Sequence, residues 1–407
     1  MSHQQLRHVP RLNRRRLLRN AGLAGIAVWT SAKSWGAEPT KSPNEKLNIA
    51  GIGVGGQGGW DVGQCASQNI VALCDVDDRR AAGSYQGFRN AKRFRDFRKM
   101  LDAMDRQIDA VVVGTPDHTH APAAVRAMTM GKHCYCEKPL AHCVYEVRTM
   151  IDLAKKNKLA TQMGTQIHAG DNYRRVVELV QSGAIGAVGE VHVWHPVAYG
   201  RDAVANGSID RPKETPPVPP ELDWDLWLGP APKRPYHPAY VPGRWRSWWD
   251  FGTGGLGDFG CHYMDLPFWA LKLRHPTTVM TEGPAIHPER TSPGLVVHYE
   301  FPARGDLPPV KMTWYDGGKR PSFLAERKIP DWGAQVLFIG QKGMLIADYS
   351  RHELLPESQY AAFRRPDPFI PRSIGHHAEW IRACKTGEST TCNFDYSGTL
   401  ADAVLLG

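Results

Sequence analysis

The sequence predicts an α/β fold with two domains, a doubly wound parallel sheet followed by an α+β domain built on an antiparallel sheet. Three observations support this prediction. At 407 residues, the chain exceeds the size at which a single hydrophobic core stops growing. Short apolar runs alternate with helical stretches up to about residue 165. After residue 277, strands follow one another through short connections.

The N-terminal domain, residues 46–165, is predicted from five apolar runs that helical stretches separate. Runs that are apolar on both faces indicate buried parallel strands, because helices then cover both sides of the sheet. The runs span residues 47–50, 70–73, 110–113, 133–136 and 159–162.

A change of pattern marks the second domain, residues 166–373. An amphipathic helix pattern over residues 172–182 ends at Gly183, and an alternating strand follows at residues 190–195. Residues 200–250 are rich in Pro and Trp and show little periodicity. The remaining strands are expected at residues 277–281, 295–301, 310–315, 335–339 and 344–347, and a helical segment over 374–407.

The net charge of +9 does not indicate a nucleic-acid partner, because residues 1–37 carry most of it. Without the seven Lys and Arg of that segment, 43 basic and 41 acidic residues remain. Arg14-Arg15, one further residue, two leucines and a short apolar stretch are typical of a twin-arginine signal peptide. We therefore expect a periplasmic or otherwise exported protein without stable membrane insertion after cleavage. A basic tail and an uncleaved anchor are the alternatives.

The eight cysteines indicate buried free thiols, because no Cys or His spacing is typical of a metal site. No metal is predicted. A Cys384–Cys392 disulfide is the alternative that an oxidising compartment leaves open.

A glycine-rich segment follows the first predicted strand and precedes a helix. Gly51, Gly53 and Gly56 match G-x-G-x-x-G in this strand–turn–helix context. We assign them to the tight turn, to the approach of the backbone to a pyrophosphate and to close helix packing, respectively. The helix N-terminus would donate amides to the phosphates. The first domain is therefore predicted to be a Rossmann dinucleotide-binding domain.

Asp75 ends the second predicted strand and bears on the choice of dinucleotide. A carboxylate there accepts hydrogen bonds from the adenosine ribose and repels a 2′-phosphate, so NAD is favoured. NADP is the alternative, because Arg79 and Arg80 could neutralise that phosphate.

Three further segments resemble the Gfo/Idh/MocA oxidoreductases, a family that includes glucose–fructose oxidoreductase and inositol dehydrogenase. They occur in the family's order and span residues 114–120 (GTPDHTH), 131–140 (GKHCYCEKPL) and 254–262 (GGLGDFGCH). The segments WDLWLG at 224–229 and WDFGTG at 249–254 resemble exported bacterial members.

The resemblance implies how the domains are built and assembled. The second sheet would be open-faced and would mediate homo-oligomerisation, as a dimer or tetramer. The segment 374–407 would pack back on the Rossmann domain. The residues implied near the cofactor are Thr115, Pro116, His120, Glu137, Lys138 and Gln166.

Catalysis is assigned to three residues. Oxidation of an alcohol removes a hydroxyl proton as hydride leaves carbon, so a base must lie beside the nicotinamide. His262 follows Asp258 by four residues and would share its helix face. The resemblance implies that His262 is the general acid/base, that Asp258 binds or orients, and that Lys138 donates to the substrate oxygen, with a cis bond to Pro139. Taken singly, Lys138 would be an ordinary loop lysine and His262 an ordinary core histidine.

The Trp-rich segment has two interpretations. Aromatic faces stack on sugars, yet tryptophans at this density also serve packing or an oligomer interface. We expect packing for most of them and name Trp245, Arg246 and Trp248 as substrate candidates. His376 and His377 are interpreted as surface residues, and His118 is interpreted as a cap of the helix expected to begin near Ala121.

These features indicate an NAD(P)-dependent oxidoreductase that acts on a hydroxyl of a sugar, glycoside or cyclitol. Free nicotinamide is absent outside the cytoplasm, so we expect a tightly bound cofactor. The alternative is a redox-neutral glycoside hydrolase, which oxidises, eliminates and re-reduces. A binding protein without turnover is a third hypothesis, against which the set of Lys138, Asp258 and His262 argues.

Overall fold

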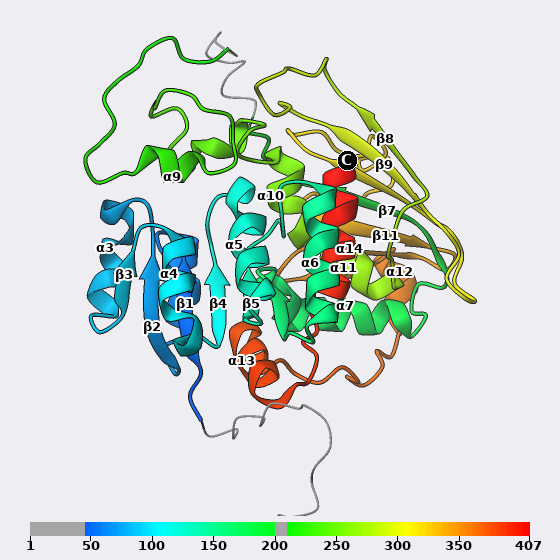
Figure 1. Cartoon of the computed structure of the whole chain (residues 1–407). Coiled ribbons are helices and arrows are strands. Elements are labelled where there is room, and N and C mark those ends of the chain that lie inside the picture. The colour runs from blue at the N-terminus through cyan, green and yellow to red at the C-terminus, as the bar shows by residue number, and fades with distance from the viewer. Residues whose placement is uncertain (1–44, 200–209) are drawn as a thin grey trace, which may run out of the picture. The chain divides into compact units, whose positions relative to one another are not determined.

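The computed structural model describes residues 45–199 and 210–407 (Figure 1). The predicted signal peptide, residues 1–37, lies outside these ranges. Within them, no helix combines the length and apolar character needed to cross a membrane.

The N-terminal sheet has six parallel strands in the order β3-β2-β1-β4-β5-β6, which confirms the doubly wound prediction. Its strands are β1 (Asn48–Ile52), β2 (Asn69–Cys74), β3 (Lys92–Phe94), β4 (Ala110–Val113), β5 (His133–Cys136) and β6 (Thr161–Met163). Its helices are α2 (Gln57–Gln64), α3 (Asp78–Gly87), α4 (Phe97–Met104), α5 (Asp117–Thr129) and α6 (Val144–Lys156), with the 3-10 turns η1 (Asp105–Gln107) and η2 (Gln166–Ala169).

Strand β4 shows why the apolar runs form a buried sheet. Val111 and Val113 face one hydrophobic cluster, whereas Ala110 and Val112 face the cluster on the other side. Both faces are therefore covered, as a parallel sheet requires. The edge strand β3 was not predicted, because its sequence Lys-Arg-Phe contains no apolar run.

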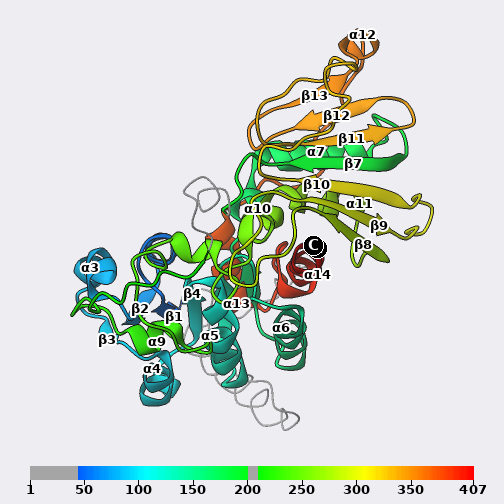
Figure 2. The same ribbon diagram turned by 90° about the horizontal axis from the view of Figure 1, so that it is seen from above.

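The second sheet has seven strands in the order β13-β12-β11-β7-β10-β9-β8 (Figure 2). These are β7 (Val188–Trp194), β8 (Thr278–Glu282), β9 (Val296–Phe301), β10 (Val310–Tyr315), β11 (Gln335–Gly340), β12 (Met344–Ala347) and β13 (His352–Leu355). The sheet is mostly antiparallel, which confirms the predicted α+β domain, and β7 and β10 form its one parallel pair among the described strands. In the chain, α9, α10 and α11 lie between β7 and β8, so no tight turn forces β7 to run antiparallel to its neighbours.

The remaining helices and the 3-10 turn η3 follow β6 in the chain. They are α7 (Asp171–Gln181), α9 (Trp224–Leu228), η3 (Arg244–Ser247), α10 (Gly254–Tyr263), α11 (Asp265–Leu271), α12 (Glu357–Tyr360), α13 (His376–Thr386) and α14 (Phe394–Leu406). Helix α14 lies beside α6 and α10 (Figures 1 and 2). Gly398 permits this approach, since an added Cβ would lie 2.5 Å from Ile151. Trp380 of α13 packs into the N-terminal domain with Leu47 and Ile49.

All eight cysteines are free, and six of them are buried. The prediction of buried free thiols is therefore confirmed for most of them, and the alternative Cys384–Cys392 disulfide is not formed. Cys143, at the start of α6, is exposed.

Candidate active site

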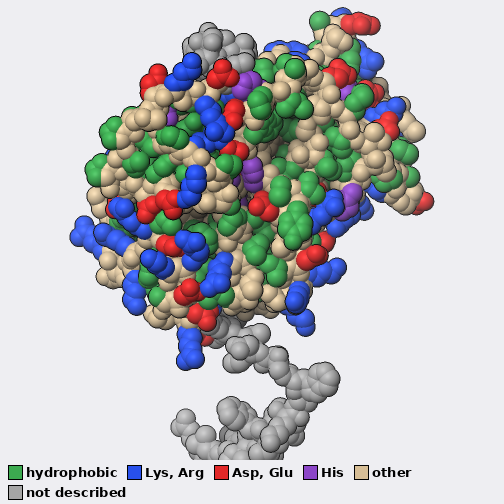
Figure 3. All heavy atoms as spheres, turned by 45° about the horizontal axis from the view of Figure 1, so that its top comes forward, with side chains coloured by type: hydrophobic (Ala, Val, Ile, Leu, Met, Phe, Trp, Pro, Cys, Tyr) green, Lys and Arg blue, Asp and Glu red, His purple; other side chains and the backbone are tan. Residues whose placement is uncertain are grey.

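A cavity of about 370 Å³ lies at the carboxyl ends of the N-terminal strands. Its walls come from the glycine-rich turn, the loops after β2, β4 and β5, the segment around η3, and α10. In an open parallel sheet this edge is where ligands bind. Figure 3 brings this side of the molecule forward and shows basic, acidic and histidine side chains together near its middle.

In the glycine-rich turn, the roles of the glycines differ from those assigned from the sequence. Gly53 has φ +75°, and an added Cβ would lie 2.7 Å from the Thr115 amide nitrogen. At Gly58 an added Cβ would overlap the Gly53 carbonyl oxygen, so Gly58 provides the close helix packing. Gly51 instead belongs to β1, and Gly56 caps α2 with φ +59°. Neither Gly51 nor Gly56 lines the cavity.

The turn therefore uses the second G-x-G-x-x-G register in this sequence, Gly53, Gly55 and Gly58. Gly53, Gly55 and Gln57 line the cavity. The cap of α2 makes no side-chain hydrogen bond, which leaves the first-turn amides for a ligand. These features fit the pyrophosphate of a dinucleotide.

Asp75 lines the cavity and also orders the turn. Its Oδ2 accepts hydrogen bonds from the amides of Val54, at 2.8 Å, and Gly55, at 3.0 Å. Burial raises the pKa of Asp75, while these amide hydrogen bonds oppose the rise. Arg80 lines the same cavity, whereas Arg79 does not.

The predicted residues after β4, β5 and β6 converge at the cavity: Thr115, Pro116, His120, Glu137, Lys138 and Gln166. The two nitrogens of the His120 ring lie 2.7 Å from the carbonyl oxygens of Thr115 and Pro139. His120 therefore joins the two loops. The Lys138–Pro139 bond is cis, as the resemblance implied.

Lys138 and Asp258 form an ion pair on the cavity wall. The Lys138 Nζ donates to the Asp258 carbonyl oxygen at 2.9 Å and to its carboxylate. Arg246 lies on the other side, with Nε 3.2 Å from Asp258 Oδ1. Burial alone would raise the pKa of Asp258, but the Lys138 and Arg246 cations hold it well below its usual range. Burial opposes the charge on Lys138, yet Asp258 and Glu137 raise its pKa.

His262 lies one turn after Asp258 on α10 and lines the same cavity. Burial, aided by the Lys138 cation, lowers the pKa of His262 to about 3. The imidazole is therefore neutral at ordinary pH and can accept a proton. The Tyr173 hydroxyl donates to the His262 carbonyl oxygen at 3.1 Å and ties the helix in place.

Tyr199 is a site residue that the sequence interpretation missed. Its hydroxyl donates to the second carboxylate oxygen of Asp258. The only available signal was its position shortly after β7, which by itself indicates nothing.

Replacing Tyr199 by Phe is expected to lower kcat/KM at least about tenfold, because Asp258 loses a charge-assisted hydrogen bond worth roughly 1.5–3 kcal/mol. Initial rates with the substrate that the native protein turns over fastest measure the effect. Tyr236→Phe is the matched control, since Tyr236 packs edge-on against Trp224 and does not line the cavity. Equal rates for both variants would contradict the role of Tyr199.

The three substrate candidates separate in the structure. Trp245 and Arg246 line the cavity, and the Arg246 guanidinium lies 4.2 Å from the Trp245 ring centre. The prediction that Trp248 contacts substrate is wrong, because its ring is buried and its Nε1 donates to the Ala239 carbonyl oxygen at 3.0 Å. It packs with Tyr240 and does not line the cavity.

Three histidines also differ from the sequence interpretation. His376 and His377 are buried, not surface residues, because α13 turns them toward the N-terminal domain. His376 Nε2 contacts the Met163 carbonyl oxygen at 2.8 Å. His118, expected to cap a helix near Ala121, lies inside α5, with Nε2 3.0 Å from the Trp227 carbonyl oxygen.

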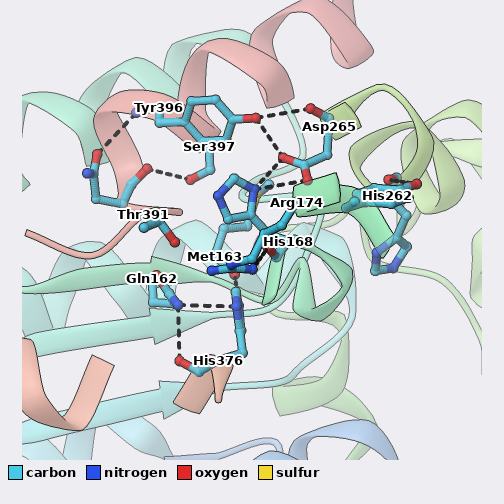
Figure 4. A network of polar contacts seen from close by, with 12 residues as sticks. Gln162, Met163, His168, Arg174, His262, Asp265, His376, Thr391, Tyr396 and Ser397 are labelled. Atoms are coloured by element: carbon cyan, nitrogen blue, oxygen red, sulfur yellow. Dashed lines mark hydrogen bonds and ion pairs between the residues drawn. The ribbon is translucent and has the colours of Figure 1, made fainter. Parts of the chain in front are cut away.

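One group of potential metal ligands occurs among the described residues: His168, Asp265 and Cys392, with ligand atoms within 4.8 Å of one another. Figure 4 shows His168 and Tyr396 pointing at Asp265, with Nδ1 at 2.9 Å and the Tyr396 hydroxyl at 2.7 Å from Oδ1. These hydrogen bonds already engage the carboxylate. The same hydrogen bonds join η2, α11 and α14.

Two sequence models of one oxidoreductase family match the chain. The model of its NAD-binding Rossmann fold covers residues 46–165, and that of its C-terminal alpha/beta domain covers residues 169–302. An inositol 2-dehydrogenase of Rubrobacter xylanophilus is 30% identical over 160 residues, 38% of this chain and 45% of that protein. A glycosyl hydrolase family 109 protein of Shewanella pealeana is 27% identical over 218 residues, 46% of this chain and 47% of that protein.

The chain thus spans about half the length of the curated relatives it matches. Among solved structures, the WlbA dehydrogenase of Bordetella pertussis in complex with NADH and UDP-GlcNAcA has a TM-score of 0.59 at 15% identity. The match covers 89% of this chain and 95% of that chain, and it shows a shared fold. With an NAD-binding Rossmann domain joined to the matching C-terminal domain, the chain belongs to the Gfo/Idh/MocA oxidoreductase family.

Proposed function

We propose that this protein is an NAD-dependent oxidoreductase that acts on a hydroxyl of a sugar, glycoside or cyclitol. The observation that carries the proposal is the placement of Lys138, Asp258 and His262 on the wall of the dinucleotide cavity. The described relatives support the substrate class, since one is an inositol 2-dehydrogenase. Asp75 in the cavity supports NAD over NADP.

The residues divide the chemistry among them. Gly53, Gly55 and Asp75 would hold NAD in the cavity, where it would supply the hydride acceptor for oxidation and the hydride donor for reduction. The Lys138 ammonium donates a hydrogen bond to the reacting oxygen and stabilises its developing negative charge. Neutral His262 accepts the hydroxyl proton. Asp258, held by Tyr199 and Arg246, fixes the position of Lys138. The Trp245 face and Arg246 bind the substrate from the side of η3.

A redox-neutral glycoside hydrolase is the second candidate, favoured by the similarity to the glycosyl hydrolase family 109 protein. The same residues would oxidise a ring hydroxyl, permit elimination of the aglycone and allow re-reduction. The cofactor would then return to its starting state in each cycle.

Export through the segment 1–37, assignment to the exported bacterial subgroup, and a homo-oligomer formed through the second sheet are further parts of the proposal. Sequence pattern and family resemblance support them. Export favours a cofactor that stays bound, because free nicotinamide is absent outside the cytoplasm.

Native mass spectrometry of the gently purified protein is expected to show a bound nicotinamide nucleotide, and its absence would contradict the bound-cofactor model. Nitrophenyl glycosides then separate the two candidate functions. Release of nitrophenol without net NADH and without an added acceptor supports the hydrolase. Formation of bound NADH with inositols or aldoses supports the dehydrogenase.

A further inference from the structure

Two carboxyl groups lie buried beside the cavity, and the mechanism above does not use them. Asp61 of α2 is 0% exposed, and Glu137, which follows β5, is 5% exposed. Glu137 lines the cavity next to Lys138, whereas Asp61 lies behind it. Each of the two carboxyl groups lies close enough to the other to affect its pKa.

A polar cage holds this acid pair. Gln166 Nε2 donates to Glu137 Oε1 at 2.6 Å and lies 3.5 Å from Asp61 Oδ1. His377 Nε2 of α13 lies 2.9 Å from the same Asp61 oxygen. The second oxygen, Asp61 Oδ2, is buried without a hydrogen-bond partner in the part of the chain that the structure describes. Gly164 leaves the room that the Glu137 carboxyl fills, since an added Cβ would overlap it.

Few opposite charges face the pair. His377 carries no compensating charge at neutral pH, because burial lowers its pKa to about 4. The Tyr135 hydroxyl and the Cys65 thiol stay neutral, since burial raises both of their pKa values. Lys138 and His120 are the basic groups that face Glu137, and Lys138 is already paired with Asp258.

Two ionised carboxylates in this position are unfavourable, because each lacks water and each repels the other. Burial raises the pKa of Asp61 to about 7. Burial, reinforced by the Asp61 charge, raises the pKa of Glu137 to about 8. Near neutral pH the pair therefore carries one proton and one negative charge.

We propose that Asp61 and Glu137 share one proton, which they release when a cationic nicotinamide occupies the cavity and regain when the nicotinamide is neutral. The inference rests on the proposed function and deepens it. During alcohol oxidation, the substrate C–H bond breaks with its electron pair going to the cofactor, and the hydroxyl proton goes to His262. A bound nicotinamide that accepted this hydride would lose its positive charge, so the pair would take up a proton from solvent. Re-reduction reverses both transfers.

The expected signature is a pH dependence of the relative affinity for the two cofactor forms. As pH rises through about 7 to 8, the pair becomes doubly ionised and NAD⁺ binding tightens relative to NADH binding. The ratio of the Kd for NAD⁺ to the Kd for NADH should fall by up to about tenfold per pH unit, the limit for one linked proton.

Equilibrium dialysis of the full chain with NAD⁺ and with NADH, from pH 6 to 9, measures this ratio without turnover. In Asp61→Asn the dependence should move to lower pH, because Glu137 no longer faces a second carboxylate. In Asp61→Asn/Glu137→Gln it should vanish. Asp316→Asn is the matched control, since Asp316 is a buried acid with a raised pKa, about 6, outside this cavity. It should keep the dependence of the native protein.

Thermal unfolding of each variant separates loss of linkage from loss of fold. A ratio that stays constant with pH in the native protein, while both forms bind, would overturn the inference and leave the proposed function intact. So would a double variant that binds both forms and keeps the native dependence. Failure of the native protein to bind either form would overturn the proposed function, and the inference with it.

Discussion

Replacing Lys138 by Ala is expected to lower kcat/KM for alcohol oxidation by about 10²–10³-fold, the usual effect of losing a donor to a developing oxyanion. The fold should survive, because Arg246 and Tyr199 still contact the Asp258 carboxylate. The loss is measured in single turnovers with inositols, aldoses and nitrophenyl glycosides, in which the absorbance of NADH monitors the reduction of bound NAD.

The same variant carries a second signature in its pH profile. The Lys138 cation lowers the pKa of His262, and Asp258 opposes this effect. Without Lys138, the His262 pKa therefore rises, and the acid limb of the rate moves upward from about pH 3. Lys138→Arg keeps the cation and should leave that limb in place. If Lys138→Ala kept the native kcat/KM and the native position of the acid limb, the assignment of Lys138 would be contradicted.

Replacing Gly58 by Ala is expected to destabilise the protein by about 1–3 kcal/mol and to weaken NAD binding at least about tenfold. The added Cβ would overlap the Gly53 carbonyl oxygen, and Gly114 lies on the same side at 3.0 Å. The turn must shift to relieve this overlap, which moves the amides that face the pyrophosphate. Urea unfolding and the Kd for NAD⁺ measure the two effects.

Gly63→Ala is the matched control, because Gly63 belongs to the same helix and an added Cβ would meet nothing within 4 Å. It should stabilise the helix by about 0.5–1 kcal/mol, since glycine in a helix costs backbone entropy. The two substitutions therefore have opposite expected signs. A destabilising Gly63→Ala with a neutral Gly58→Ala would place the close contact elsewhere.

Local pattern predicted most of the N-terminal fold and much of the site. Strand β4 was predicted because its run of buried apolar residues is continuous. Strands β10 and β12 were predicted with the observed ends. By contrast, β13 was not predicted, because it begins with His352 and Glu353 and shows no apolar alternation.

The site predictions were wrong where two local sequence patterns were equivalent and one of them had to be chosen. The sequence Gly51 to Gly58 contains two G-x-G-x-x-G registers, and spacing cannot tell them apart. Only the structure shows that Gly51 lies within β1 and that Gly58 contacts the turn. Similarly, Trp245 and Trp248 look alike in the sequence, yet only Trp245 lines the cavity.

The sequence by itself determined the order of most elements, the presence of a dinucleotide-binding turn and the family resemblance, because periodicity and short motifs are properties of neighbouring residues. The tertiary structure decided which distant groups meet. Lys138 and Asp258 are 120 positions apart, and Asp61 and His377 are 316 positions apart. Their contacts depend on how the sheets and α13 pack, and burial then sets their pKa values. Short-range sequence pattern carries no information about these contacts or these pKa values.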